Sequence, residues 1–283
     1  MNVLIIRDTN LPDANTNHLE NEIMQRGRTC QQILFTRILV EVNGEVNFYY
    51  AGELIRPQIV VNWLVNRSAR GFQLLKAFEA AGYPVVNSAD GWWSSGSDFL
   101  TSLCLHRNQV PHPCSWHAFS WAGANTNRQR LAYPLIHLPS GRFGNSTMIR
   151  LEDQTALEKR LQAFRGGQQS LDFQQARESQ CLGLVQVFVL DGRALAAYSI
   201  AQNFWGQPQH SRRALLALEE GVTVLAEKAA RGLGLDFCAV KLYQYAEEWE
   251  VSTVIASPDF SSFEESFGLN IAGSIADWLC KIK

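Results

Sequence analysis

Hydrophobic positions in the first part of the chain follow two patterns that alternate along the sequence. Continuous apolar runs, typical of strands buried on both faces of a parallel sheet, alternate with stretches whose apolar residues recur every three or four positions, as in helices packed on such a sheet. Strands are expected at residues 3–6, 30–34 and 59–64, and helices at 15–27 and 71–81. This alternation predicts a doubly wound α/β unit over residues 1–88.

The pattern changes after residue 88, where short strands and hairpin-forming strands become common. Asp191-Gly192 is a tight-turn sequence between two apolar stretches, which predicts a hairpin of residues 182–190 and 193–200. Further strands are expected at 115–118, 135–138, 237–243 and 250–256, and helices at 152–164 and 214–233. This mixture predicts an α+β architecture for residues 89–283.

Composition limits the classes of function. The 283 residues are 46% hydrophobic, which suits a large buried core. With 25 Lys and Arg against 27 Asp and Glu, the formal net charge of -2 gives no reason to expect nucleic acid or a membrane as a partner. No apolar run approaches the roughly 18 residues of a spanning helix, and charge follows the first short run at Arg7, so we expect a cytoplasmic location.

Cysteine usage points to reduced thiols rather than a disulfide framework. The six cysteines are scattered without C-x-x-C spacing. Five residues of metal-binding type fall close together, namely Cys104, His106, His112, Cys114 and His117. Their spacing matches no closed zinc motif, so we interpret them as core or surface residues and expect no metal site.

Five phrases, in this order, resemble the RimK-like branch of the ATP-grasp enzymes. They are NRSARGFQLLKAFEAAGYPVVNS (66–88), LGLVQVFVLDGRALAA (182–197), AARGLGLDFCAVKL (229–242), ASP (256–258) and NIAGSIADWL (270–279). The resemblance implies a Rossmann-like pre-ATP-grasp domain at 1–88 and a two-subdomain ATP-grasp domain at 89–283. Within the latter it implies a small lid subdomain at about 115–170 and a core subdomain at about 171–283. Members of that branch join a carboxylate to an amine using ATP and Mg²⁺.

The positions of the family's magnesium ligands carry other residues in this chain. The Asp of the family's A-x-V-D-L strand corresponds to Lys241, and the Glu and Asn of its last strand correspond to Thr253 and Ile255. Mg²⁺ is normally held by one or two carboxylates together with the phosphates. Two like charges about 4 Å apart repel by roughly 4 kcal/mol at an effective dielectric constant near 20. The resemblance therefore predicts that magnesium binding in the family's mode is lost.

The nucleotide positions are altered as well. Two lysines and a hinge glutamate of the family correspond to Phe99, His137 and Gln175. A glycine-bearing loop remains and is a candidate anion site, with Gly141, Arg142, Gly144 and Asn145 as its residues. A plain hairpin turn is the other interpretation of that loop. The Lys241 ammonium either replaces the metal as the partner of an anion or extends to solvent while its alkyl stem packs.

Candidate substrate-side residues lie where strand ends of the first domain should meet the site, and in the basic phrase QPQHSRRA. They are Arg7, Asp8, Asn66, Arg67, Arg70, His210, Arg212 and Arg213. For Arg67 a purely structural role, and for the basic phrase a solvated loop, are the alternative interpretations.

Three functions follow from these residues. The first is a pseudoenzyme with the RimK-like fold and no cofactor, acting as a binding or regulatory subunit of an active paralogue or within a homo-oligomer, with a small anion as its ligand. The second is a working carboxylate-amine ligase of the glutamate-ligase type that uses ATP and Mg²⁺, in cofactor biosynthesis or protein-tail modification. The third is a different enzyme that uses His137, Lys241 or Arg142 on a phosphorylated small molecule.

Overall fold

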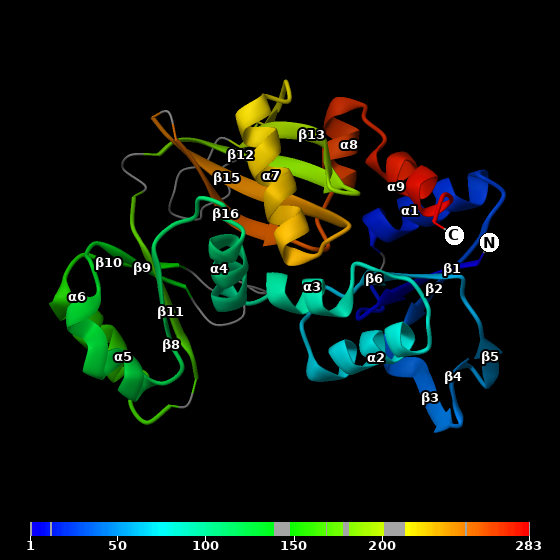
Figure 1. The fold of residues 1–283 in the computed structure, drawn as a ribbon, viewed down its shortest axis with the longest axis horizontal. Coiled ribbons are helices and arrows are strands. Elements are labelled where there is room, and N and C mark those ends of the chain that lie inside the picture. The colour runs from blue at the N-terminus through cyan, green and yellow to red at the C-terminus, as the bar shows by residue number, and fades with distance from the viewer. Residues whose placement is uncertain are drawn as a thin grey trace.

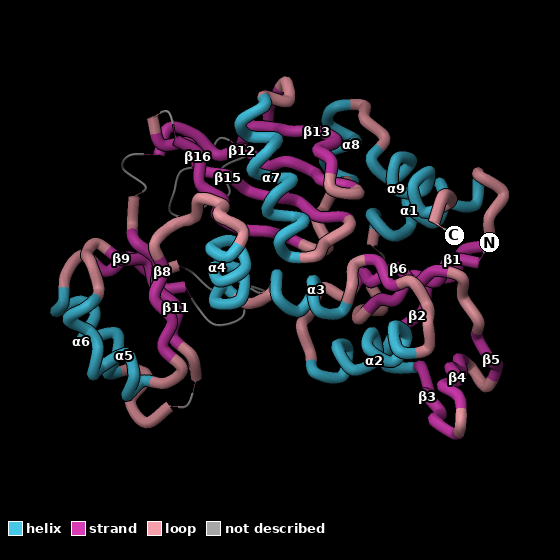
Figure 2. Tube along the Cα trace, viewed as in Figure 1, coloured by secondary structure: helices cyan, strands magenta, loops and turns pink. Residues whose placement is uncertain are grey.

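The computed structural model describes residues 2–11, 13–138, 148–167, 169–177, 181–200, 213–246 and 248–282, without the side chain of Arg213. Their strands form four sheets, which Figure 2 shows as separate groups of strands. No helix in these ranges is both long and apolar enough to cross a membrane. The fold is of the mixed α/β class that the sequence predicts.

The first sheet is parallel and has a helix on each face. Its strands, in the order β2-β1-β6-β7, are Thr29–Leu34, Asn2–Arg7, Ile59–Trp63 and Val85–Val86. The helices are α1 (Ala14–Gln25) and α2 (Ala69–Ala80). Alternate residues of β1 point to opposite faces, so Val3 packs with Ile23 of α1 while Leu4 packs with Phe78 of α2. This is the doubly wound arrangement.

A small antiparallel sheet extends from this unit. It consists of β3 (Ile38–Asn43), β4 (Glu45–Tyr50) and β5 (Glu53–Ile55), preceded by the short helix η1 (Phe35–Arg37). Gly44 makes the tight turn between β3 and β4 with a φ of 75°. Phe48 stacks on Phe78 of α2 with ring centroids 3.8 Å apart, which anchors the small antiparallel sheet to the parallel unit.

Two helices, α3 (Ala89–Ser95) and α4 (Asp98–Arg107), lead from the parallel sheet to the rest of the chain. Just before α3, the buried Asn87 side chain donates to the backbone carbonyls of Phe237 and Ala256, both at 2.7 Å. The start of the second part is therefore fixed to strands that come some 150 residues later.

Strands β8 to β11 form an antiparallel sheet, which we call the lid sheet. In the order β10-β9-β11-β8 they are Ile149–Leu151, Leu135–Leu138, Leu171–Gln175 and Ser115–Ala118. Two helices, α5 (Trp121–Asn127) and α6 (Gln154–Gln162), cover one face, with the short helix η2 (Arg128–Arg130) after α5. Leu157 of α6 packs with Leu135 and Phe173 in a core separate from the rest of the molecule.

The largest sheet, the core sheet, is antiparallel in the order β14-β13-β12-β15-β16. Its strands are Arg213–Leu216, Arg193–Ile200, Cys181–Leu190, Phe237–Tyr245 and Glu248–Ile255, and α7 (Glu220–Leu233) lies against it. The helix predicted from residue 214 was wrong at its start. Residues 214–216 instead pair with β13, with Ala214 opposite Ser199, and the helix begins only at Glu220.

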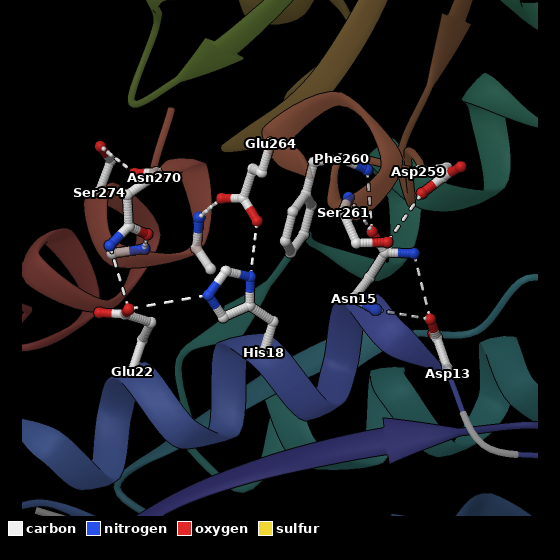
Figure 3. Close-up of polar contacts among 12 residues, drawn as sticks. Asp13, Asn15, His18, Glu22, Asp259, Phe260, Ser261, Glu264, Asn270 and Ser274 are labelled. Carbon is white, nitrogen blue, oxygen red and sulfur yellow. Dashed lines mark hydrogen bonds and ion pairs between the residues drawn. The ribbon is translucent and has the colours of Figure 1, made fainter. Parts of the chain in front are cut away.

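The C-terminal helices return to the N-terminal unit. Figure 3 shows His18 of α1 between two carboxylates, with its Nδ1 atom 2.6 Å from Oε2 of the buried Glu264 and its Nε2 atom 3.8 Å from Oε1 of Glu22. Asn270 donates to Glu22 at 3.0 Å. The helices that carry these contacts opposite α1 are α8 (Ser261–Phe267) and α9 (Ile271–Leu279).

Candidate functional site

Lys241, Thr253 and Gln186 lie in one row across the core sheet. Lys241 on β15 is directly opposite Thr253 on β16 and directly opposite Gln186 on β12. Residues opposite each other in antiparallel strands share a face. Because Val240 and Leu242, on either side of Lys241, pack in the core with α7, the row faces away from α7.

Ile255 shares this face. It lies two residues beyond Thr253, opposite Ala239, and packs on the side of the sheet where Phe188 lies. The structure thus brings together the three positions that the sequence assigns to the altered metal ligands. They offer one ammonium, one hydroxyl and one aliphatic side chain, and the Thr253 hydroxyl lies 3.4 Å from that of Ser252.

The lid sheet has one face against α5 and α6 and the other toward α4. Trp116 and Phe173 point to the helix-covered face, where they pack with the core of α6. His117 therefore points to the opposite face, where the ring of Phe99 on α4 meets it edge-on with centroids 5.2 Å apart. Phe99 also contacts Phe119, so Phe99 is part of an aromatic cluster.

His137 lies on the helix-covered face of the lid sheet. It is opposite Phe173 on β11, and its ring lies between those of Phe173 and Phe164, with centroids 5.4 and 5.5 Å away. Burial lowers the pKa of His137 to about 4, and the nearby Arg160 guanidinium lowers it further, while Asp172 opposes them. At neutral pH the imidazole is uncharged, so it does not replace the positive charge of a lysine.

Gln175 is the last residue of β11, where the chain leaves the lid sheet. Its backbone N–H donates to the Cys114 carbonyl at 2.9 Å. Two residues later, Arg177 pairs with Glu250 of β16 and lies over the Tyr245 ring, 4.3 Å from the centroid. Burial raises the pKa of Glu250, and Arg177 opposes this shift. This ion pair connects the end of the lid sheet to the core sheet.

The first candidate substrate-side residues lie at the carboxyl end of β1. Asp8 accepts a hydrogen bond from the backbone N–H of Asn66, so two loops of the first unit meet here. Among the described residues, Arg7 Nε and Asp8 Oδ1 are buried without a hydrogen-bond partner, and such atoms are commonly satisfied by water or a ligand. Arg70 is exposed on the first turn of α2.

The Arg67 side chain contacts residues of α3. Its guanidinium donates to the Trp92 carbonyl at 3.1 and 3.2 Å and to the Ser95 hydroxyl at 2.9 Å, and it lies 5.1 Å from the centroid of the Trp92 ring. Burial lowers the pKa of Arg67 to about 10, against the effect of Asp8. These contacts fix α3 against the loop after β6.

Some predicted site residues cannot be placed. Gly141, Arg142, Gly144, Asn145, His210 and Arg212 lie outside the described residues, and only the backbone of Arg213 is described, as the first residue of β14. Within the described ranges, no three Cys, His, Asp or Glu side chains come together in a group suited to a metal ion.

One constellation was missed by sequence reasoning. The His117 Nδ1 atom lies 2.8 Å from Asp172 Oδ1, and its Nε2 atom lies 3.1 Å from the Ser115 hydroxyl. In the sequence His117 stood only within a cluster of Cys and His residues. The Ser-x-His spacing in an expected strand was the available signal, but Asp172 comes from a strand 55 positions later.

Comparison with known proteins confirms the fold and the resemblance. No protein-family model matches the chain. It is similar to a probable alpha-L-glutamate ligase of Pasteurella multocida, with 26% identity over 71% of this chain, a match that spans 66% of the relative. It is also similar to a probable alpha-L-glutamate ligase 2 of Hahella chejuensis, with 24% identity over 75% of this chain and 71% of the relative. The chain therefore has the fold of the ATP-grasp ligases and is similar in sequence to these two proteins.

Solved structures share this RimK-like fold along nearly its whole length. The ATP-grasp ligase PsnB, in complex with a minimal precursor, Mg and ADP, has a TM-score of 0.74 at 18% identity over 98% of this chain and 96% of its own. A RimK domain ATP-grasp protein from Sphaerobacter thermophilus has a TM-score of 0.74 at 18% identity, and the match covers 98% of this chain and 99% of that protein. The macrocyclase MdnC from Microcystis aeruginosa, bound with the precursor peptide MdnA, has a TM-score of 0.76 at 11% identity. This match covers 100% of both chains.

Proposed function

We propose that this RimK-like protein acts as a binding or regulatory subunit and does not perform Mg-ATP-dependent ligation in the family's way. The observation that carries the proposal is the row formed by Lys241, Thr253 and Gln186 on the core sheet. A cation stands at the centre of that row, flanked by two neutral side chains. The same face continues with the aliphatic side chain of Ile255.

The donor set of this row does not fit magnesium. Mg²⁺ requires hard oxygen ligands in near-octahedral geometry and is usually held by one or two carboxylates. Here the protein would offer a hydroxyl and an amide oxygen beside an ammonium, which repels a dication. We derive no catalytic step through a metal at this position.

The positive charge of the Lys241 ammonium suits an anion better than a dication. The Lys241 side chain is partly buried, where the effective dielectric constant is lower than in water and the attraction for a phosphate or carboxylate is stronger. A small anionic ligand, held without a metal, is therefore part of the proposed function. A peptide or a paralogous chain is the proposed macromolecular partner, since PsnB and MdnC, which share the fold, are described with precursor peptides.

Thermal unfolding with ATP or ADP, each with and without Mg²⁺, tests the proposal. A ligand at 100 times its dissociation constant stabilises a fold by about 2.7 kcal/mol, which a melting curve detects. We expect no magnesium-dependent rise. Any metal-independent rise should also occur with inorganic phosphate and should be lost in Lys241→Ala. A rise that requires Mg²⁺ together with ATP would contradict the proposal.

The second candidate function is an ATP-dependent carboxylate-amine ligase. It is favoured by the names of the two curated relatives, both probable alpha-L-glutamate ligases, and by the ligases among the solved structures. The decisive assay is ADP release in the presence of Mg-ATP, glutamate and a peptide that carries an acidic residue. Turnover that disappears without either the acid or the amine would select the ligase.

A further inference from the structure

Ser115, His117 and Asp172 form a hydrogen-bonded chain on the face of the lid sheet that does not pack against α5 and α6. Phe99 of α4 contacts His117 on this face, and Figure 1 shows α4 beside the lid sheet. Ser115 and His117 are two positions apart on β8 and therefore share a face, and Asp172 is directly opposite His117 on β11. Regular strand geometry thus holds the three groups in place.

The contacts run from the Asp172 carboxylate through the His117 imidazole to the Ser115 hydroxyl, which is the order found at activated serines. The carboxylate contacts His117 Nδ1 and therefore favours the tautomer that carries its proton there. The other nitrogen, Nε2, is then the acceptor and lies 3.1 Å from the Ser115 hydroxyl. A nucleophile within hydrogen-bond reach of a base that is oriented by a third group is the signature of nucleophilic catalysis.

Asp172 has no evident structural task that explains its burial. It is 9% exposed, and a buried carboxylate is costly unless it is paired. Within the described ranges its recorded ion-pair partner is His117, on the neighbouring strand, and it caps none of the helices. We therefore assign the Asp172 carboxylate the role of orienting the His117 imidazole.

Gln174 completes the constellation. It lies directly opposite Ser115 on β11 and on the same face as Asp172, and the Cβ atoms of directly opposite residues are about 4.5–5.5 Å apart. A glutamine amide can donate to an oxyanion that forms at a carbonyl attacked by Ser115. Phe99 and the 70% exposed Phe119 add an apolar surface beside His117 that suits a short acyl chain.

We propose that Ser115 is a nucleophile for acyl transfer from esters, with His117 as its general base, Asp172 as the positioning residue and Gln174 as oxyanion donor. The Ser115 oxygen bonds to the ester carbonyl carbon while its proton passes to His117 Nε2. The carbon–oxygen bond to the alcohol breaks, and the alcohol leaves with that proton. Water, deprotonated by the same imidazole, then releases the carboxylic acid and restores the serine. This site does not depend on nucleotide or metal binding.

Labelling of the full chain with a fluorophosphonate probe tests the site, because such probes bond covalently to activated serines. The modified residue is identified by mass spectrometry of peptides. We expect the label on Ser115 in the native protein, with a rate at least 100-fold above that of the urea-unfolded chain, in line with the range of about 10²–10⁴ for general base catalysis. Absence of label, or label spread over other hydroxyls, would overturn the proposal.

Variants separate catalysis from structure. Ser115→Ala should remove the label, and His117→Gln should slow labelling at least 100-fold. Ser274→Ala should match the wild type, because the half-buried Ser274 hydroxyl donates to the Asn270 carbonyl, far from His117 in the sequence and on another element. With p-nitrophenyl acetate as substrate, Asp172→Asn should lower kcat and leave KM within about twofold. Undiminished labelling in His117→Gln, or an Asp172→Asn effect confined to melting temperature, would refute these roles.

Discussion

Asn87 and Phe237 lie 150 positions apart and exchange two hydrogen bonds. The Asn87 Nδ2 atom donates to the Phe237 carbonyl at 2.7 Å, and the Phe237 N–H donates to Asn87 Oδ1 at 2.8 Å. With the further bond to the Ala256 carbonyl, one buried side chain satisfies three backbone groups at the ends of two core strands. The Asn87 amide is therefore one of the contacts that join the first unit to the core sheet.

Asn87→Ala should destabilise the protein by about 3 kcal/mol or more, because each buried polar group left without a partner costs about 1–3 kcal/mol. Urea unfolding measures the change. The control is Asn127→Ala, since the exposed Asn127 amide bonds a carbonyl of its own helix and should cost at most about 0.5 kcal/mol. Equal losses in the two variants would show that the Asn87 bonds are not important.

Gly96→Ala should destabilise the protein by about 1–3 kcal/mol through overpacking, because an added Cβ would overlap the Arg67 side chain. Adding Arg67→Ala should remove that overlap, so the double variant should be less unstable than the sum of the two single variants. Gly221→Ala, where a Cβ meets nothing within 4 Å, serves as the control and should be neutral or slightly stabilising. Strict additivity would mean that Arg67 does not occupy the position described.

His137 should make the protein sensitive to acid. Its pKa is about 4 in the folded state, below the ordinary value of about 6.5, so the unfolded chain binds the proton first as pH falls. The free energy of unfolding should therefore decline between about pH 6.5 and pH 4, by about 2–3 kcal/mol in total. His137→Leu should flatten this part of the profile, whereas the exposed His106→Gln should not. An unchanged profile in His137→Leu would contradict the buried neutral imidazole.

Asp236 should make the protein less stable as pH rises, which is the opposite of the effect of His137. Burial, and then Asp191, raise the pKa of Asp236 from 3.8 to about 6, so the folded state holds its proton more tightly than the unfolded chain. Stability should fall as pH rises from about 4 to 6, and Asp236→Asn should be more stable than the wild type at pH 7 by about 1–3 kcal/mol. Melting at a series of pH values measures this. Asp90→Asn, at an exposed carboxylate, is the control, and a destabilised Asp236→Asn would refute the account.

Restoring the family's residues tests the row on the core sheet. The triple variant Lys241→Asp, Thr253→Glu, Ile255→Asn places three oxygen-bearing side chains on one face of β15 and β16. Its affinity for Mg²⁺, measured by titration calorimetry, should rise at least tenfold, which is about 1.4 kcal/mol. The single variant Lys241→Asp, as the reverse-charge control, should gain less Mg²⁺ affinity than the triple variant. If the triple variant gains nothing, the assignment of these residues to the metal positions is wrong.

Local patterns predicted most elements, and non-local pairing explains the misses. The strands predicted at 115–118, 135–138 and 193–200 agree with β8, β9 and β13, and the last of them is marked in the sequence by the Asp191-Gly192 turn before it. The residues before Glu220 carry a helical pattern, yet pairing with β13 makes them a strand. Likewise, Ser115 and His117 are visible in sequence, but their relation to Asp172 depends on the register of β8 and β11, which no local pattern encodes.

The packing of α1 against α8 and α9 has a consequence for synthesis. His18 and Glu22 can contact Glu264 and Asn270 only after some 250 further residues have been made. At about 5–20 residues per second, the side of α1 that carries His18 and Glu22 stays uncovered for on the order of 10 to 50 seconds. The contacts of α1 with α8 and α9 are therefore among the last contacts of the first unit to form during synthesis.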